Sequence, residues 1–214
     1  MTDDNQTIIT DVKSNNLKNT LIDNKKSIIG TLIFILILLF GYFFYSDFKK
    51  EKKVQISEKY NFAVVSYEKD NPSISITEMK DIINSKDPTY SPLALYFLID
   101  NELLINKNEL NEYFDILINN VDLDDEIKKL IIYKKGLYNS DSASEDELLE
   151  IFKPLINTQN LWQSHTLYVL AEYFFSKNEK QKSKEFFEKI IELDNPNPQI
   201  KIEAQKRLQR DFSA

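Results

Sequence analysis

Few side chains in this sequence have the chemistry of a catalytic or metal-binding group. The 214 residues include a single histidine, His165, and no cysteine. A multi-histidine metal centre, a thiolate metal site, a disulfide and a cysteine nucleophile are therefore excluded. The three glycines, Gly30, Gly41 and Gly136, lie far apart, so the sequence has no glycine-rich loop for a phosphate or a dinucleotide. We expect neither a metal site nor a cofactor.

Carboxylates are the remaining candidates for chemistry. There are 34 Asp and Glu residues, but they fall at spacings typical of solvated helical faces. The acidic stretch DLDDE at 122–126 lacks the central glycine and the terminal glutamate of a calcium loop. It is better explained as the first turn of a helix, where the helix dipole favours negative charge. We expect a protein that is not an enzyme. The alternative is a carboxylate hydrolase of envelope polymers that uses a pair such as Glu172 and an Asp or Glu of a neighbouring helix.

The charge of the chain argues against nucleic acid as a partner. The formal net charge is −7. Lysines and aspartates balance in residues 1–27, so the negative charge belongs to the part after Tyr45. An acidic domain repels the phosphate backbone.

An apolar run near the start of the sequence has the length of a membrane span. From Ile28 to Tyr45 there are 18 residues without a charge. As a helix they would extend about 27 Å, close to the hydrocarbon thickness of a bilayer. The run ends in aromatic residues and then lysines, and it has no small-residue cleavage site. We expect a single transmembrane helix over 28–45, preceded by a short polar tail over 1–27.

The sequence after this run has the periodicity of helices. Apolar residues recur at three- and four-residue steps from Ile56 to Tyr67, which predicts a helical stalk over 46–70. Two capping boxes, one opened by Ser75 and the other by Ser144, predict further helix starts. No strand-like alternation of comparable length appears. The expected fold class is all-α.

The stretch from Leu167 to Pro198 resembles a tetratricopeptide repeat. The motif's alternation of large and small residues is matched in the first helix by Leu167, Leu170, Ala171 and Phe174, and in the second by Ser183, Phe187 and Ile190. Small residues at these positions let the two helices of a pair approach closely. The resemblance implies a solenoid of helical hairpins over 71–214, closed by a C-terminal capping helix.

Gly136 has two possible roles. It stands 35 residues before Ala171, the same interval that separates Phe152 from Phe187. It is either the small packing residue of an earlier, degenerate repeat or the C-cap of a helix. The sequence leaves both roles open.

The repeat resemblance also suggests where a partner would bind. The first helix of each pair lines the concave surface of such an array, and the corresponding positions are His165, Tyr168, Glu172 and Phe175. We expect these four residues to contact a partner protein. An alternative is that Tyr168 and Phe175 only pack against the neighbouring repeat. A surface this rich in aromatic residues suits a peptide segment better than a small-molecule substrate.

The whole chain resembles the YfgM-like ancillary subunits of the bacterial SecYEG translocon. The most specific stretches are TYSPLAL with NKNEL, at 89–110, and LWQSHTLYVLAEYFFSKNEKQKSKEFFEKII, at 161–191. The resemblance implies a non-enzymatic, chaperone-like adaptor of the inner membrane. Its partners would be the subunits of the secretion channel and membrane-anchored periplasmic chaperones. The tail would be cytoplasmic and the repeat domain periplasmic, and no catalytic residue is carried over.

The lysines beside the apolar run do not favour that orientation. Four lysines precede the run and five follow it closely, so the positive-inside rule mildly opposes a cytoplasmic tail. Long domains are translocated largely regardless of flanking charge. The alternative function is a scaffold that assembles an envelope or cell-division complex, with the repeat domain in the cytoplasm if the orientation is reversed.

Overall fold

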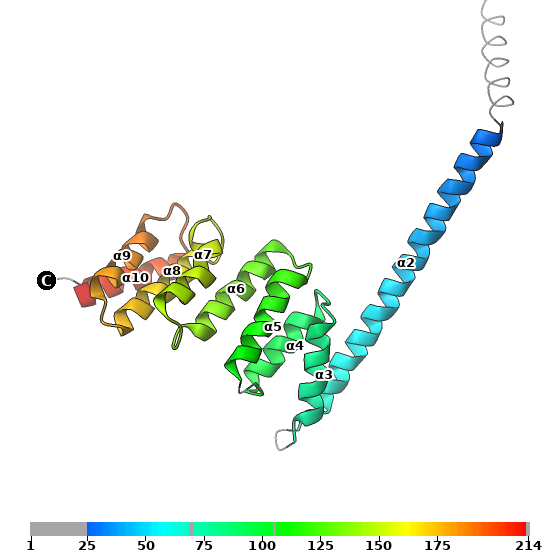
Figure 1. Cartoon of the computed structure of the whole chain (residues 1–214). Coiled ribbons are helices and arrows are strands. Elements are labelled where there is room, and N and C mark those ends of the chain that lie inside the picture. Colours follow the sequence, from blue (N-terminus) through cyan, green and yellow to red (C-terminus); the bar gives the residue numbers. More distant parts are fainter. Residues whose placement is uncertain (1–24, 69–70, 105, 213–214) are drawn as a thin grey trace, which may run out of the picture. The chain divides into compact units, whose positions relative to one another are not determined.

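The computed structural model describes residues 25–68, 71–104 and 106–212 (Figure 1). Most of the expected polar tail, over 1–27, lies outside these residues. The described residues form helices and connecting turns and contain no β-strand, so the expectation of an all-α chain is confirmed for them. The chain divides into two units, Met1–Gln55 and Ile56–Ala214.

The described helices follow one another at short intervals. Their bounds are α2 Lys25–Val65, α3 Ser73–Asn84, α4 Tyr90–Asp100, α5 Lys107–Asn120, α6 Asp125–Asn139, α7 Glu145–Ile156, α8 Gln163–Ser176, α9 Lys180–Glu192 and α10 Pro198–Phe212. Helix α2 carries residues of both units, whereas α3 to α10 belong to the second. The expected stalk over 46–70 is helical as far as Val65.

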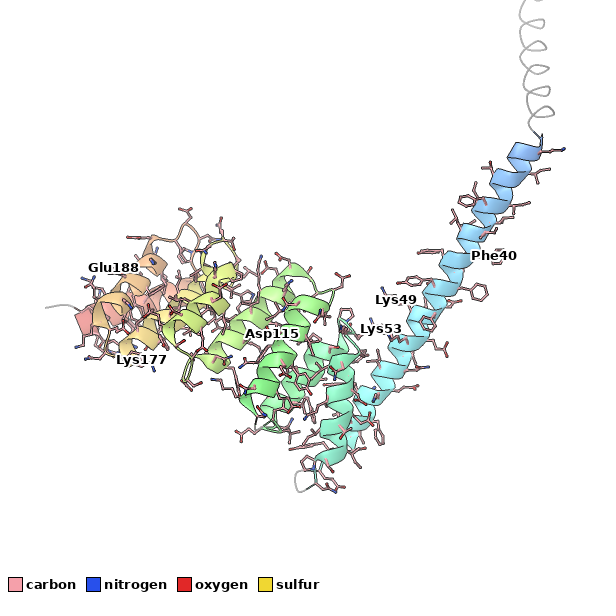
Figure 2. All side chains as sticks on the ribbon, in the orientation of Figure 1. Phe40, Lys49, Lys53, Asp115, Lys177 and Glu188 are labelled. Carbon is pink, nitrogen blue, oxygen red and sulfur yellow. The ribbon has the colours of Figure 1, made fainter. Side chains whose placement is uncertain are left out.

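In the first unit, helix α2 is long and apolar enough to span a membrane. Its most apolar window of 18 residues has a mean hydropathy of 2.2. The described side chains there are exposed; Phe40, which projects outward from the ribbon in Figure 2, is 63% exposed. An apolar helical surface of this kind is unfavourable in water, and a bilayer would supply the apolar surroundings that it lacks.

The second unit begins inside α2. Ile56 and Ala63, on one face of that helix, are buried in the same core cluster as residues of α3 and α4. The Tyr60 ring also packs there, with its centroid 5.7 Å from that of Tyr90. The apolar periodicity read from the sequence therefore marks a packed face of the folded unit.

The capping box expected at Ser75 is wrong. Helix α3 begins two residues earlier, at Ser73, and has no side-chain cap. Ser75 is buried, and its hydroxyl donates to the carbonyl oxygen of Ala63 at 2.8 Å. A buried hydroxyl needs a hydrogen-bond partner, and here the neighbouring helix supplies it. The local capping signal was overridden by a tertiary contact.

The core of the second unit consists of three clusters arranged in chain order. The first joins the end of α2 to α3, α4 and α5 and includes Ile131 of α6. The second joins α6, α7 and α8, and the third joins α8, α9 and α10. The phenylalanines among the fully buried side chains are Phe114, Phe152, Phe174 and Phe187. In Figure 1 the helices of this unit accordingly lie beside their neighbours in the sequence.

Gly136 is a packing residue. It lies inside α6, which continues to Asn139, and its φ is not positive, so the C-cap alternative is wrong. A β-carbon at this position would overlap the ring of Phe152 on α7. That ring is fully buried. The absence of a side chain at Gly136 is what lets α6 and α7 pack this closely.

The second capping box, at Ser144, is confirmed at the start of α7. The Ser144 hydroxyl accepts a hydrogen bond from the Glu147 backbone N–H, and the Glu147 carboxylate accepts one from the Ser144 backbone N–H at 2.9 Å. The Glu147 carboxylate thus accepts hydrogen bonds from both the backbone N–H and the hydroxyl of Ser144, and these bonds lower the pKa of Glu147. The cap is therefore charged at neutral pH and fixes the first turn of α7.

Replacing Ser144 with alanine should lower the free energy of unfolding by about 1 kcal/mol, because one N–H of the first turn loses its acceptor. The measurement is urea unfolding of the full chain in a nonionic detergent. Glu147→Gln serves as the control, since glutamine can still accept from the Ser144 backbone N–H; it should cost less. An equal loss in both variants would point to the charge of Glu147 rather than to the cap.

Candidate functional site

The four residues expected to contact a partner all lie on α8, but the structure separates them into two groups. His165 lies in the first turn of the helix and faces Trp162 and Tyr133. Tyr168, Glu172 and Phe175 follow at steps of three and four residues and contact α9 or α10. We therefore describe these as two separate clusters.

The first group is an aromatic cluster between α6 and the start of α8, made of Tyr133, Trp162 and His165. The rings of Tyr133 and Trp162 are stacked, with centroids 5.3 Å apart. The His165 ring lies 5.7 Å from that of Trp162. Trp162 Nε1 and His165 Nδ1 are inaccessible to solvent and have no hydrogen-bond partner among the described residues. The sequence reading missed Tyr133, because its contact with α8 depends on how α6 is rotated.

The second group is covered by the chain's own last helix. The Glu172 carboxylate accepts a hydrogen bond from the guanidinium of Arg207 on α10. That guanidinium also lies over the Phe175 ring, 4.6 Å from its centroid. Phe212, near the end of α10, meets Phe175 edge to face at 5.9 Å. The side chains of Glu172 and Phe175 thus make contacts with α10.

Tyr168 stands in a different environment. Its ring packs edge to face on Phe187 of α9, with centroids 5.5 Å apart. Burial, with the nearby Glu172 carboxylate, raises the pKa of Tyr168, so its hydroxyl is neutral and able to donate at physiological pH. Tyr168 thus packs within its own repeat, against α9, and Phe175 packs against α10. That these residues also bind a partner stays a prediction.

A hollow of about 510 Å³ lies between α6 and α8. Its α8 side includes Tyr168 and Glu172, whereas His165 and Phe175 do not line it. Its α6 side includes Leu137, which is 47% exposed, and Asp141 in the following turn. An apolar side chain next to a phenol and two carboxylates makes a hollow that can hold one side chain of a peptide. We call it the Tyr168 hollow.

A larger groove, of about 940 Å³, lies between α5 and α7 with α6 as its floor. The sequence reading missed it. The available signal was the spacing of Asn108, Asn111 and Asn119, which the structure places on one face of α5. Amide side chains on a solvated helix were indistinguishable from the lysine- and asparagine-rich composition of the rest of the chain.

Metal chemistry has no support in the described ranges. Within them, no group of three or more His, Asp or Glu side chains converges in a way that could hold a metal ion. The strongly shifted pKa values belong to ion pairs and buried phenols. One example is Asp211, whose pKa is lowered to about 2 by its hydrogen bonds to Arg210 and Arg207.

The fold and these surfaces define an all-α protein with one N-terminal helix long and apolar enough to cross a membrane. Comparison with known proteins adds no closer identity. No family model, no curated protein and no solved structure matches the chain.

Proposed function

We propose that this protein is a non-enzymatic, membrane-anchored adaptor that binds other proteins through a tetratricopeptide-like helical array. One observation carries the proposal. Helix α2 begins as an exposed apolar segment and ends as a buried element of the folded unit, through Ile56 and Ala63. A single helix thus serves as both the anchor and the first helix of the array.

The packing of the second unit supports a solenoid of helical hairpins. Helices α8 and α9, which carry the repeat motif, bring Ala171, Phe187 and Ile190 into one cluster. Gly136 and Phe152 make the equivalent close contact between α6 and α7, one repeat earlier. Helix α10 closes the array as a capping helix, since only Ala204 of its residues is fully buried. Polar outer faces of this kind are required of terminal repeats.

The Tyr168 hollow is the proposed contact site for a partner. It is lined by the exposed side chain of Leu137, which would lose contact with water when a partner binds. The resemblance to YfgM-like subunits implies, as partners, secretion-channel subunits and membrane-anchored periplasmic chaperones. The adaptor would sit in the inner membrane, with residues 28–45 as its span and the array in the periplasm.

The alternative is a scaffold for an envelope or cell-division complex, with the array in the cytoplasm. The exposed lysines of α2, Lys49 and Lys53 among them, favour it (Figure 2). They follow the apolar segment directly, and positive charge is enriched on the cytoplasmic side. The partner captured by a photoreactive residue at Tyr168 would separate the two functions.

Replacing Lys180 with cysteine tests on which side of the membrane the array lies. The chain has no native cysteine, and Lys180 is exposed at the start of α9. In cells with a permeabilised outer membrane, Lys180→Cys should react with a membrane-impermeant maleimide before lysis. Thr7→Cys, in the tail, is the matched control and should react only after lysis. The reverse pattern would refute the periplasmic adaptor and leave the cytoplasmic scaffold.

A further inference from the structure

The groove between α5 and α7 has three distinct surfaces. One wall is a face of α5 that carries Asn108, Asn111, Asp115 and Asn119; Figure 2 labels Asp115. The floor is a face of α6, with Ile132, Lys135 and Asn139, and the other wall is a face of α7, with Asp146, Glu150 and Ile151. We call this the amide groove. It shares no lining residue with the Tyr168 hollow.

Two asparagines that line the amide groove are hydrogen-bonded to each other. Asn111 Nδ2 donates to Asn139 Oδ1 at 3.1 Å, and Asn139 Nδ2 donates to Asn111 Oδ1 at 2.8 Å. Asn139 is 4% exposed, and its second N–H donates to the carbonyl oxygen of Lys135. Asn111 therefore keeps one N–H and one oxygen lone pair available on a side chain that cannot turn. A donor beside an acceptor in fixed orientation is the pattern that a peptide group pairs with.

Further amides extend this pattern along α5. Asn108 and Asn119 are exposed on the same face, and their side chains make no hydrogen bond to the described part of the chain. Asn108 precedes Asn111 by about 4.5 Å of helix rise, and Asn119 follows it by about 12 Å. Together they cover the length of about five residues of extended chain. This spacing suits hydrogen bonds to the backbone of a bound peptide, because every residue of a backbone offers the same donor and acceptor.

The charge of the amide groove selects the side chains of the bound segment. Of its two lysines, Lys135 pairs with Asp115 at 2.7 Å, whereas Lys107 bonds to the neutral hydroxyl of Ser142 and keeps its positive charge. Asp146 is exposed and makes no ion pair within the described ranges. The partner of Glu150 is the exposed Lys153 of its own helix, a contact that water screens. The groove is lined by two lysines and four carboxylates, Glu147 among them, so its net charge is negative.

Apolar contacts complete the amide groove. Ile132 of the floor is 7% exposed, and Ile118 and Ile151 are partly buried beside it. Side chains alternate between the two faces of an extended chain. One face of a bound segment would therefore meet these isoleucines, and the other would reach the carboxylates of α7.

We propose that the amide groove binds an extended peptide segment of about five residues in which basic and apolar side chains alternate. The segment is held through its backbone by the asparagines of α5, and its basic side chains pair with Asp146 and Glu150. This second binding surface does not depend on the side of the membrane on which the array lies. It stands on different residues from those of the proposed adaptor site.

The test uses the full chain in a nonionic detergent and the peptide Lys-Ile-Lys-Ile-Lys carrying a neutral fluorophore. Fluorescence anisotropy should show saturable binding. The double variant Asp146→Lys, Glu150→Lys should weaken this binding by about tenfold or more, because the charge on one wall is reversed. The matched control is Glu185→Lys with Glu192→Lys, which makes the same change in net charge on exposed positions of α9. The control should bind within about twofold of the original chain.

A second arm tests recognition of the backbone. The same peptide with N-methylated amides should bind about tenfold more weakly, because its backbone donors are gone. Tyr168→Ala should leave binding of the probe unchanged, whatever it does to the adaptor function. The proposal is overturned if the probe does not bind at concentrations on the order of 1 mM. It is also overturned if N-methylation does not weaken binding, or if the groove reversal weakens binding no more than the control reversal on α9. Loss of binding in Tyr168→Ala would overturn it as well.

Discussion

Gly136→Val is expected to lower the free energy of unfolding of the second unit by about 3 kcal/mol. The β-carbon of any side chain at 136 would overlap the Phe152 ring, which is fully buried between α6 and α7. The ring cannot withdraw into solvent, so the two helices must separate or the ring must leave its rotamer. Both responses cost free energy in a close-packed core. Urea unfolding followed by circular dichroism measures the loss.

The chain offers a matched control and a rescue for this prediction. A β-carbon at Gly41 would meet nothing within 4 Å, so Gly41→Val should leave the second unit as stable as before. The double variant Gly136→Ala, Phe152→Leu should lose less free energy of unfolding than the two single variants lose together. The smaller leucine leaves room for the new methyl group. If Gly136→Val unfolds like the original chain, close packing at this position is refuted.

Arg207→Ala is expected to weaken the packing of α10 and to lower the free energy of unfolding by about 2 kcal/mol. The Arg207 guanidinium is paired with Glu172 on α8 and with Asp211 on its own helix. It also lies over the rings of Phe175 and Phe187. Its side chain is only 13% exposed. The substitution removes these contacts and leaves the Glu172 carboxylate without its partner, which is more costly than losing an exposed pair.

Hydrogen exchange along α10 is the measurement, and Arg210→Ala is the control. Arg210 is 68% exposed and its ion pair is with Asp211, so its removal should cost much less, because water screens an exposed pair. Amides of α10 should exchange faster in Arg207→Ala than in Arg210→Ala. Equal exchange in the two variants would mean that Arg207 does not hold the helix.

The same ion-pair cluster gives α10 a defined response to acid. Hydrogen bonds from Arg210 and Arg207 lower the pKa of Asp211 to about 2. Because the folded-state pKa lies below that of the unfolded chain, the stabilisation is complete above about pH 4. It is lost as the pH falls through about 2. Exchange along α10 should therefore be independent of this carboxylate between about pH 5 and 8.

The features that could be predicted from the sequence are those whose cause lies within one turn or one motif. The capping box at Ser144 depends on a residue three positions away, and the apolar length of α2 is a property of its own residues. The packing role of Gly136 was one of the two roles left open by the sequence, and the 35-residue repeat interval to Ala171 was the signal for it. Each of these signals is readable without knowing how helices are rotated against one another.

The features that could not be predicted depend on that rotation. Ser75 carries a local capping signal, but its hydroxyl bonds to α2, twelve residues earlier. Asn111 and Asn139 meet from different helices, 28 residues apart. The role of α10 in covering Glu172 and Phe175 follows from the angle at which it returns onto α8. The amino-acid sequence alone gives no information on such angles.

The arrangement of the core in three successive clusters bears on how the chain folds. Neighbouring clusters share only a few partly buried residues, Ile118 between the first and second and Ile156 with Phe186 between the second and third. Most contacts therefore join residues close in sequence, and the entropy lost in closing loops is small. The helices before α6 can complete most of their core before α8 has been synthesised. A nascent chain with this contact order can fold stepwise from its N-terminal side, and a locally unfolded C-terminal cluster leaves the first one largely intact.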